Sequence, residues 1–97
     1  MGATISLQTT VVAASEQVST RLDDETVLLE LKKGTYYGLN KVGTLVWEML
    51  QQPQAIDTIC AAVLNEYSVE PEICRRDVLR LIEEMKAVGL VELRSAS

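Results

Sequence analysis

The chain has 97 residues, of which 47% are hydrophobic and 24% are charged. These proportions are typical of one globular domain and exclude wholesale disorder. Nine basic and fourteen acidic side chains give a net charge of −5. Binding to nucleic acid or to an anionic membrane is therefore not expected, because both need clustered positive charge. With no apolar run of about 18 residues and no signal-peptide pattern, we expect a single cytoplasmic domain over residues 1–97.

The residues available for chemistry are few. Cys60 and Cys74 form no CxxC pair and histidine is absent, so neither a Cys/His zinc site nor a histidine-activated nucleophile can form within one chain. We expect both cysteines to be buried on helices; a disulfide is the alternative, which a reducing cytosol disfavours. The adjacent carboxylates at 23–24 and 83–84 fall in a predicted turn and on the polar side of a predicted helix, and therefore lack the desolvation that acid catalysis needs. The sequence predicts no enzymatic activity, no metal and no cofactor.

The first part of the chain is predicted to form strands. Residues 4–12, 16–22, 26–31 and 35–39 are rich in β-branched and aromatic residues or alternate with period two. Two aspartates at 23–24 and the sequence Lys-Lys-Gly at 32–34 are typical turn residues, and Gly34 can adopt a positive φ. We interpret the strands at 16–22, 26–31 and 35–39 as an antiparallel meander.

The rest of the chain is predicted to form three helices. Asn40 is a candidate N-cap for a helix that ends before Pro53. A second helix starts near Ala55, and a third opens near Pro71 and stops at Gly89. Residues 90–93 are a possible short terminal strand. Strands at 4–39 followed by helices at 40–93 indicate an α+β domain, in which a three-stranded meander packs on three helices in the manner of a winged helix-turn-helix.

The most informative strand is the third of the meander. Thr35-Tyr36-Tyr37-Gly38-Leu39 would form a short edge, whose unpaired backbone groups either need covering or recruit an extended peptide. The alternative is that one tyrosine packs on the core and the other is merely exposed. On the third helix, Leu79 lies off the main apolar stripe and in line with three residues at helical spacing, which are Arg75, Ile82 and Lys86. This face is either half of a groove or a surface with one additional exposed leucine.

A cluster of arginines at 75, 76 and 80 on the third helix suggests a second class of function. Three helices with a small sheet also occur in winged-helix DNA-binding proteins, whose recognition helix lies against phosphates. The acidic residues that share this helix and the net charge of the chain argue against that reading.

Three segments together resemble the PqqD-like family, the recognition elements for precursors of ribosomally synthesised and post-translationally modified peptides. They are VLLELKKGTYYGLNKVGTLVWEML (residues 27–50), EYSVEP (66–71) and DVLRLIEEMKAVGLVEL (77–93). Their order and spacing follow the family pattern over residues 11–93. Among its branches, the chain is most similar to the stand-alone proteins of lasso-peptide clusters.

The resemblance implies a non-catalytic protein that binds the leader of a precursor peptide as an added strand and presents it to a leader peptidase or another modifying enzyme. On this chain the implied site is the strand at 35–39 and the helix face of Arg75, Leu79, Ile82 and Lys86. The segment at 4–12 fits the family less clearly. It could pair with the sheet, extend it, or swap into a second copy, so the chain is expected to be a monomer or a strand-swapped dimer.

Overall fold

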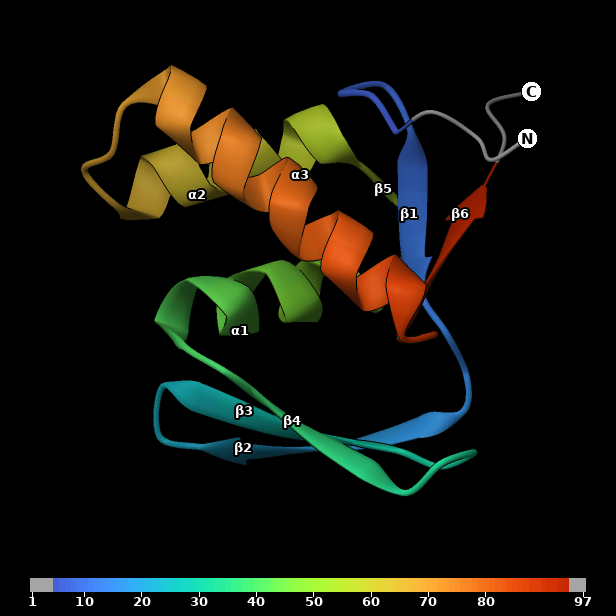
Figure 1. The fold of residues 1–97 in the computed structure, drawn as a ribbon. Coiled ribbons are helices and arrows are strands. Elements are labelled where there is room, and N and C mark those ends of the chain that lie inside the picture. The colour runs from blue at the N-terminus through green and yellow to red at the C-terminus, as the bar shows by residue number, and fades with distance from the viewer. Residues whose placement is uncertain (1–4, 95–97) are drawn as a thin grey trace.

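The computed structural model describes residues 5–94 and contains three helices and two small sheets. The helices are α1 (Lys41–Met49), α2 (Ile56–Glu66) and α3 (Pro71–Ala87). The strands are β1 (Thr10–Ala13), β2 (Gln17–Leu22), β3 (Glu25–Glu30), β4 (Thr35–Leu39), β5 (Gln54–Ala55) and β6 (Val91–Arg94). In Figure 1 the sheet of β2, β3 and β4 lies below α1, and α3 crosses above α1. The predicted α+β class, the meander and the order of its elements are confirmed.

The meander has the predicted antiparallel register. Its strand order is β2-β3-β4, with Leu28 opposite Tyr37 and Leu29 opposite Tyr36. Because side chains alternate along a strand, the face that carries Leu28 and Tyr37 is turned toward the helices. A buried hydrogen bond of 2.9 Å from the Thr26 hydroxyl to the Thr44 hydroxyl links β3 to α1 on that face.

The prediction for residues 4–12 is partly wrong. Thr4 lies outside the described residues, residues 6–9 form a turn, and the strand begins only at Thr10. The turn is stabilised locally, because the Ser6 amide donates to the Thr9 hydroxyl at 2.9 Å and the Thr9 amide donates to the Ser6 carbonyl at 3.1 Å. β1 does not join the meander but pairs with β5 and β6 in a second sheet.

β1 is held in the second sheet by the burial of its side chains and by a hydrogen bond to the end of α1. Val11 is fully buried in the core, opposite Leu93 of β6. The Ala13 amide donates to the Leu50 carbonyl at 2.7 Å, which ties the end of β1 to the end of α1. These partners all belong to the same chain, and the strand-swapped dimer stays a prediction.

The helix ends carry the predicted signals. The Asn40 side chain accepts a hydrogen bond of 2.9 Å from the Gly43 amide, as expected of an N-cap. Pro71 occupies the first turn of α3, and Gly89, directly after the C-cap, adopts a φ of +81°. Gly34 has a φ of +67° in the turn between β3 and β4. A side-chain cap therefore marks the start of α1, whereas the backbone preferences of proline and glycine mark both ends of α3 and the turn before β4.

One core joins the helices to both sheets. Its buried side chains are Val11, Leu28, Val46, Trp47, Leu50, Ile56, Ile59, Cys60, Val63, Cys74, Val78, Ile82, Met85, Leu90 and Val91. The two cysteines are buried and reduced, as predicted. Within residues 5–94, no helix is long and apolar enough to cross a membrane.

Candidate functional site

β4 is an edge strand of the meander. It pairs with β3 on one side and has no neighbouring strand on the other among the described residues. Tyr36 is 69% exposed on the outer face, whereas Tyr37 is partly buried against the core. This arrangement is the simpler alternative given by the sequence, in which one tyrosine packs on the core and the other is exposed. The free side of β4 also carries the unpaired backbone groups to which an extended chain can hydrogen-bond.

Glu30 fixes the turn that leads into β4. Its side chain is only 5% exposed, and its two carboxylate oxygens accept hydrogen bonds of 2.9 Å from the backbone amides of Lys32 and Lys33. A buried carboxylate costs free energy unless its lone pairs are satisfied, and here the turn satisfies them. Sequence reasoning missed this role because an acidic residue in a strand ordinarily faces solvent.

An apolar hollow of about 100 Å³ lies beyond the C-terminal end of β4. Its α1 wall is Val42, three residues after β4 ends, and its α3 wall includes Ile73, Asp77 and Leu81. Val69 and Ile73 are 43% and 42% exposed. The hollow therefore presents apolar surface to solvent and can receive an apolar side chain.

A polar hollow of about 400 Å³ lies at the opposite end of β4. It is bordered by the β3–β4 turn, by the loop between β1 and β2, and by the C-terminal end of α3. Lys32, Lys33 and Lys86 all line it. β4 has five residues and therefore a length of about 17 Å at ~3.3 Å per residue. The residues that flank it line one hollow each, Lys33 before the strand and Val42 after it.

The chain that contains this edge strand matches a known protein family. Residues 25–91, more than half of the chain, match the family described as "Coenzyme PQQ synthesis protein D (PqqD)". The chain belongs to the PqqD family. The resemblance inferred from the sequence is therefore confirmed, and the chain is a PqqD-type binding domain and not an enzyme.

Two solved structures have the same fold as this PqqD-family chain. The first, described as "TbiB1 in Complex with the TbiA(beta) Leader Peptide", is 34% identical with a TM-score of 0.79 and covers 89% of this chain and 99% of that one. The second, "Lasso peptide synthetase B1 complexed with the leader peptide", is 24% identical with a TM-score of 0.69 and covers 84% of this chain and 96% of that one. No curated protein matches the chain.

The four helix residues expected at the site lie in different environments. Ile82 is fully buried in the core, and Lys86 lines the polar hollow. Leu79 is partly buried and lines neither hollow, and Arg75 is exposed. Successive helix residues are separated by about 100°, so Leu79 and Leu81 point about 160° apart, on opposite sides of the buried stripe of α3. The structure therefore brings Leu81, and not Leu79, to the hollow beyond β4.

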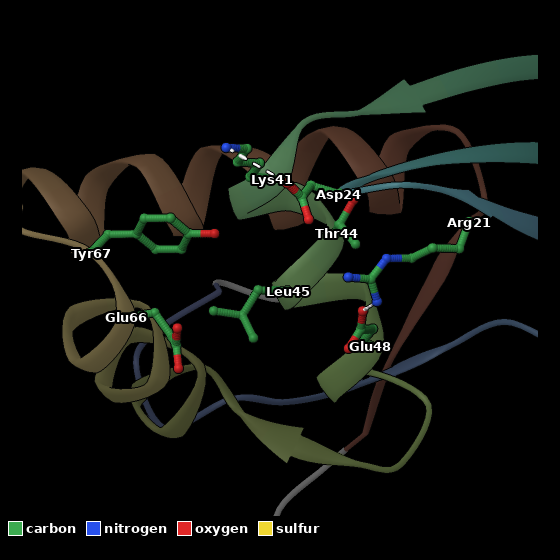
Figure 2. Close-up of a pocket in the computed structure, with 8 residues that line it drawn as sticks. All are labelled: Arg21, Asp24, Lys41, Thr44, Leu45, Glu48, Glu66 and Tyr67. Carbon is green, nitrogen blue, oxygen red and sulfur yellow. Dashed lines mark hydrogen bonds and ion pairs between the residues drawn. The ribbon is translucent and has the colours of Figure 1, made fainter.

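A third hollow, of about 460 Å³, lies between the β2–β3 turn, α1 and the end of α2 (Figure 2). Two ion pairs cross it: Arg21 with Glu48, and Lys41 with Asp24 at 3.7 Å. All four side chains are about half exposed or more, so the pairs contribute little to stability. Because four of its five charged side chains are already paired, and only Glu66 is not paired within residues 5–94, this hollow is a weaker candidate for a binding site than the apolar one.

The outer face of the meander carries exposed apolar side chains. Val18, Leu22, Leu31 and Tyr36 are each more than half exposed. The partly buried Leu29 of β3 pairs with Val18 on β2 and with Tyr36 on β4, so it connects two of these exposed residues across all three strands. Soluble monomeric domains rarely expose contiguous apolar patches of this kind unless they bind a partner.

Proposed function

We propose that the protein binds the leader region of a ribosomally made precursor peptide and presents it to the enzyme that processes or modifies the peptide. The observation that carries this proposal is an edge of β4 that no strand within residues 5–94 pairs with, and that has a hollow near each end, in a chain of the PqqD family. The similar structures support it, since TbiB1 is in complex with the TbiA(beta) leader peptide.

In this proposal the leader adds as a strand along Thr35, Tyr36, Tyr37, Gly38 and Leu39. Backbone hydrogen bonds give affinity with little demand on sequence, and pockets for side chains supply specificity. An apolar leader side chain enters the hollow between Val42 and Leu81, which contributes about 1.5–3 kcal/mol if a large side chain is fully buried.

The helix side of the site has two candidate surfaces. The sequence pointed to the face of Arg75, Leu79, Ile82 and Lys86, whereas the hollow beyond β4 favours the side of Ile73 and Leu81. We favour the second surface because Ile82 is buried and Leu79 lies about 160° from Leu81 around α3. Lys86 remains in the proposed site through its position in the polar hollow.

The enzyme that receives the precursor docks, in this proposal, on the outer face of the meander. This face adjoins β4, so an added leader strand would extend it and join the peptide to the docking surface. A leader peptidase of a lasso-peptide system is the leading candidate, in keeping with the synthetase described among the similar structures. The complex acts in the cytoplasm, where the two buried thiols stay reduced.

The alternative is a small winged-helix regulator that binds nucleic acid or a protein through α3. Arg75, Arg76 and Arg80 are exposed on this helix, but Arg76 lies 3.7 Å from Asp77 and the chain carries a net charge of −5. Both facts weaken attraction to phosphates.

A fluorescence-polarisation titration tests the proposal. The probes are a labelled leader of the precursor encoded nearest to this gene and a labelled DNA duplex. We expect saturable binding of the leader at about micromolar concentration, which corresponds to about −8 kcal/mol, and no response to the duplex. Duplex binding that weakens steeply with salt, without leader binding, would support the regulator instead.

A further inference from the structure

The polar hollow at the start of β4 gathers a third of the positive charge of an acidic protein. The chain has nine Lys and Arg residues and a net charge of −5, and three of the nine line this one hollow: Lys32, Lys33 and Lys86. They come from the β3–β4 turn and from the last turn of α3, which are far apart in the sequence. The fold therefore brings three lysines together at this place, where three glutamates also line the hollow.

Three glutamates line the same hollow and balance its formal charge, but only one of them forms an ion pair with a lysine. Glu16 lies 3.5 Å from Lys32 in an ion pair. The carboxylate of Glu30 is buried and bonded to the backbone of the turn. Within residues 5–94, neither Lys33 nor Lys86 has an ion-pair partner, and of the lining acids only Glu92 has no bonded partner. Two lysines and one glutamate are thus left to act on a ligand.

Lys33 and Lys86 lie near the start of β4, the strand with which the peptide is proposed to pair. Lys33 lies two residues before β4 begins, and the hollow also adjoins the end of α3. A peptide that pairs with the whole of β4 and fills the apolar hollow at the far end would continue into the polar one. The peptide residues in the polar hollow would lie about five or more positions along the peptide from the residue in the apolar hollow, because an extended chain advances ~3.3 Å per residue.

We propose that this hollow is a second subsite, in which Lys33 and Lys86 bind an acidic side chain of the peptide. The subsite rests on the proposed function, because it recognises the same peptide that pairs with β4. It adds a charge requirement to backbone pairing, which by itself is nearly independent of sequence. The leader would therefore need an apolar residue and an acidic residue separated by about the length of β4.

The test measures leader affinity for Lys33→Gln, Lys86→Gln and the double variant. Arg80→Gln is the matched control, because Arg80 is an exposed cation of α3 that lines none of the three hollows. Each lysine variant should weaken binding about two- to fivefold at low salt, and the double variant about tenfold, in line with exposed ion pairs. Arg80→Gln should change affinity less than twofold. At about 1 M salt the differences should disappear, since the Debye length falls to ~3 Å.

Leader peptides with single Asp→Asn or Glu→Gln changes complete the test. We expect one such peptide to lose affinity for the wild-type protein and to become insensitive to the lysine substitutions, which is the signature of a direct pair in a double-mutant cycle. Lysine variants that behave like Arg80→Gln, or a tight leader without an acidic residue, would overturn the subsite. If the unmodified leader does not bind the wild-type protein at all, the proposed function fails instead.

Discussion

Glu30 illustrates how a single buried residue positions the edge strand β4. Its carboxylate is enclosed between the sheet and the β3–β4 turn and accepts two backbone amides. A backbone hydrogen bond also closes the turn, since the Gly34 amide donates to the Glu30 carbonyl at 2.9 Å. β4 thus begins from a turn that is fixed on both sides, and an edge strand fixed in advance loses less entropy when a peptide pairs with it.

Replacing Glu30 by glutamine should destabilise the fold. Glutamine offers one acceptor oxygen where two amides donate, and leaving a buried amide unpaired costs about 1–3 kcal/mol. Glu16→Gln is the matched control, because Glu16 is exposed and its pair with Lys32 contributes about 0–1 kcal/mol. Urea unfolding measures both variants. Equal midpoints for Glu30→Gln and the wild type would contradict the role assigned to Glu30.

The two thiols make stability depend on pH in the alkaline range. Burial, with a smaller contribution from Cys74, raises the pKa of the Cys60 thiol from 9.0 to about 11; burial also raises the pKa of Cys74. The unfolded state therefore loses the Cys60 proton first as the pH rises. The free energy of unfolding that the protonated Cys60 thiol contributes is constant below pH 9. It is lost progressively between pH 9 and about 11.

This dependence is measured by comparing the wild type with Cys60→Ala, in which the titrating group is absent. The difference in unfolding free energy between the two proteins should shrink as the pH rises above 9. A difference that stays constant up to pH 11 would mean that Cys60 ionises equally in both states.

At the scale of elements, α3 has one buried stripe of side chains with a partly buried surface on each side of it. Cys74, Val78, Ile82 and Met85 form the stripe. Leu79 and Leu81 lie on its two sides and are both partly buried. The helix therefore offers two possible walls for a peptide, and only the Leu81 side borders the hollow beyond β4.

Leu81→Glu and Leu79→Glu distinguish the two walls. Both place a charge at a partly buried leucine of the same helix, so circular dichroism and thermal unfolding show whether each variant remains folded. We expect Leu81→Glu to weaken leader binding at least tenfold, about 1.4 kcal/mol, and Leu79→Glu to weaken it clearly less. The opposite order, in folded variants, would return the site to the helix face indicated by the sequence.

The elements differ in how well the sequence predicted them, for physical reasons. Asn40, Pro71 and Gly89 act through local backbone chemistry, so the helix ends were predicted within one or two residues. The two-residue strand β5 has no periodicity to detect. The start of β1 was misplaced because Ile5 and Leu7 alternate like a strand although their segment forms a turn that packs on the core.

The sequence indicated the edge strand of the candidate site, whereas the helix face it indicated, Arg75, Leu79, Ile82 and Lys86, stays a prediction. A run of two tyrosines between glycines identified β4, which the structure places at an edge. The spacing of Leu79 on α3 identified an additional leucine but not the side of the helix that borders a hollow. That choice depends on how α3 crosses α1, which no local pattern encodes.

For the whole molecule, the two sheets have separate tasks. The sheet of β5, β1 and β6 ties the N-terminal segment to the end of α3, whereas the meander presents an edge and an outer face. Each strand of the first sheet pairs within the same chain, and a monomer satisfies these pairings. The central claim concerns the other sheet: a leader peptide extends it at β4.

Residue-resolved amide hydrogen exchange, with and without the bound leader, tests that claim most directly. Alternate amides of an edge strand point outward and gain a hydrogen bond when another strand pairs with it. We expect alternate amides of Thr35–Leu39 to exchange at least tenfold more slowly in the complex, with no comparable change along Gln17–Leu22 at the other edge. Protection along Gln17–Leu22, or on the helices alone, would contradict strand addition at β4.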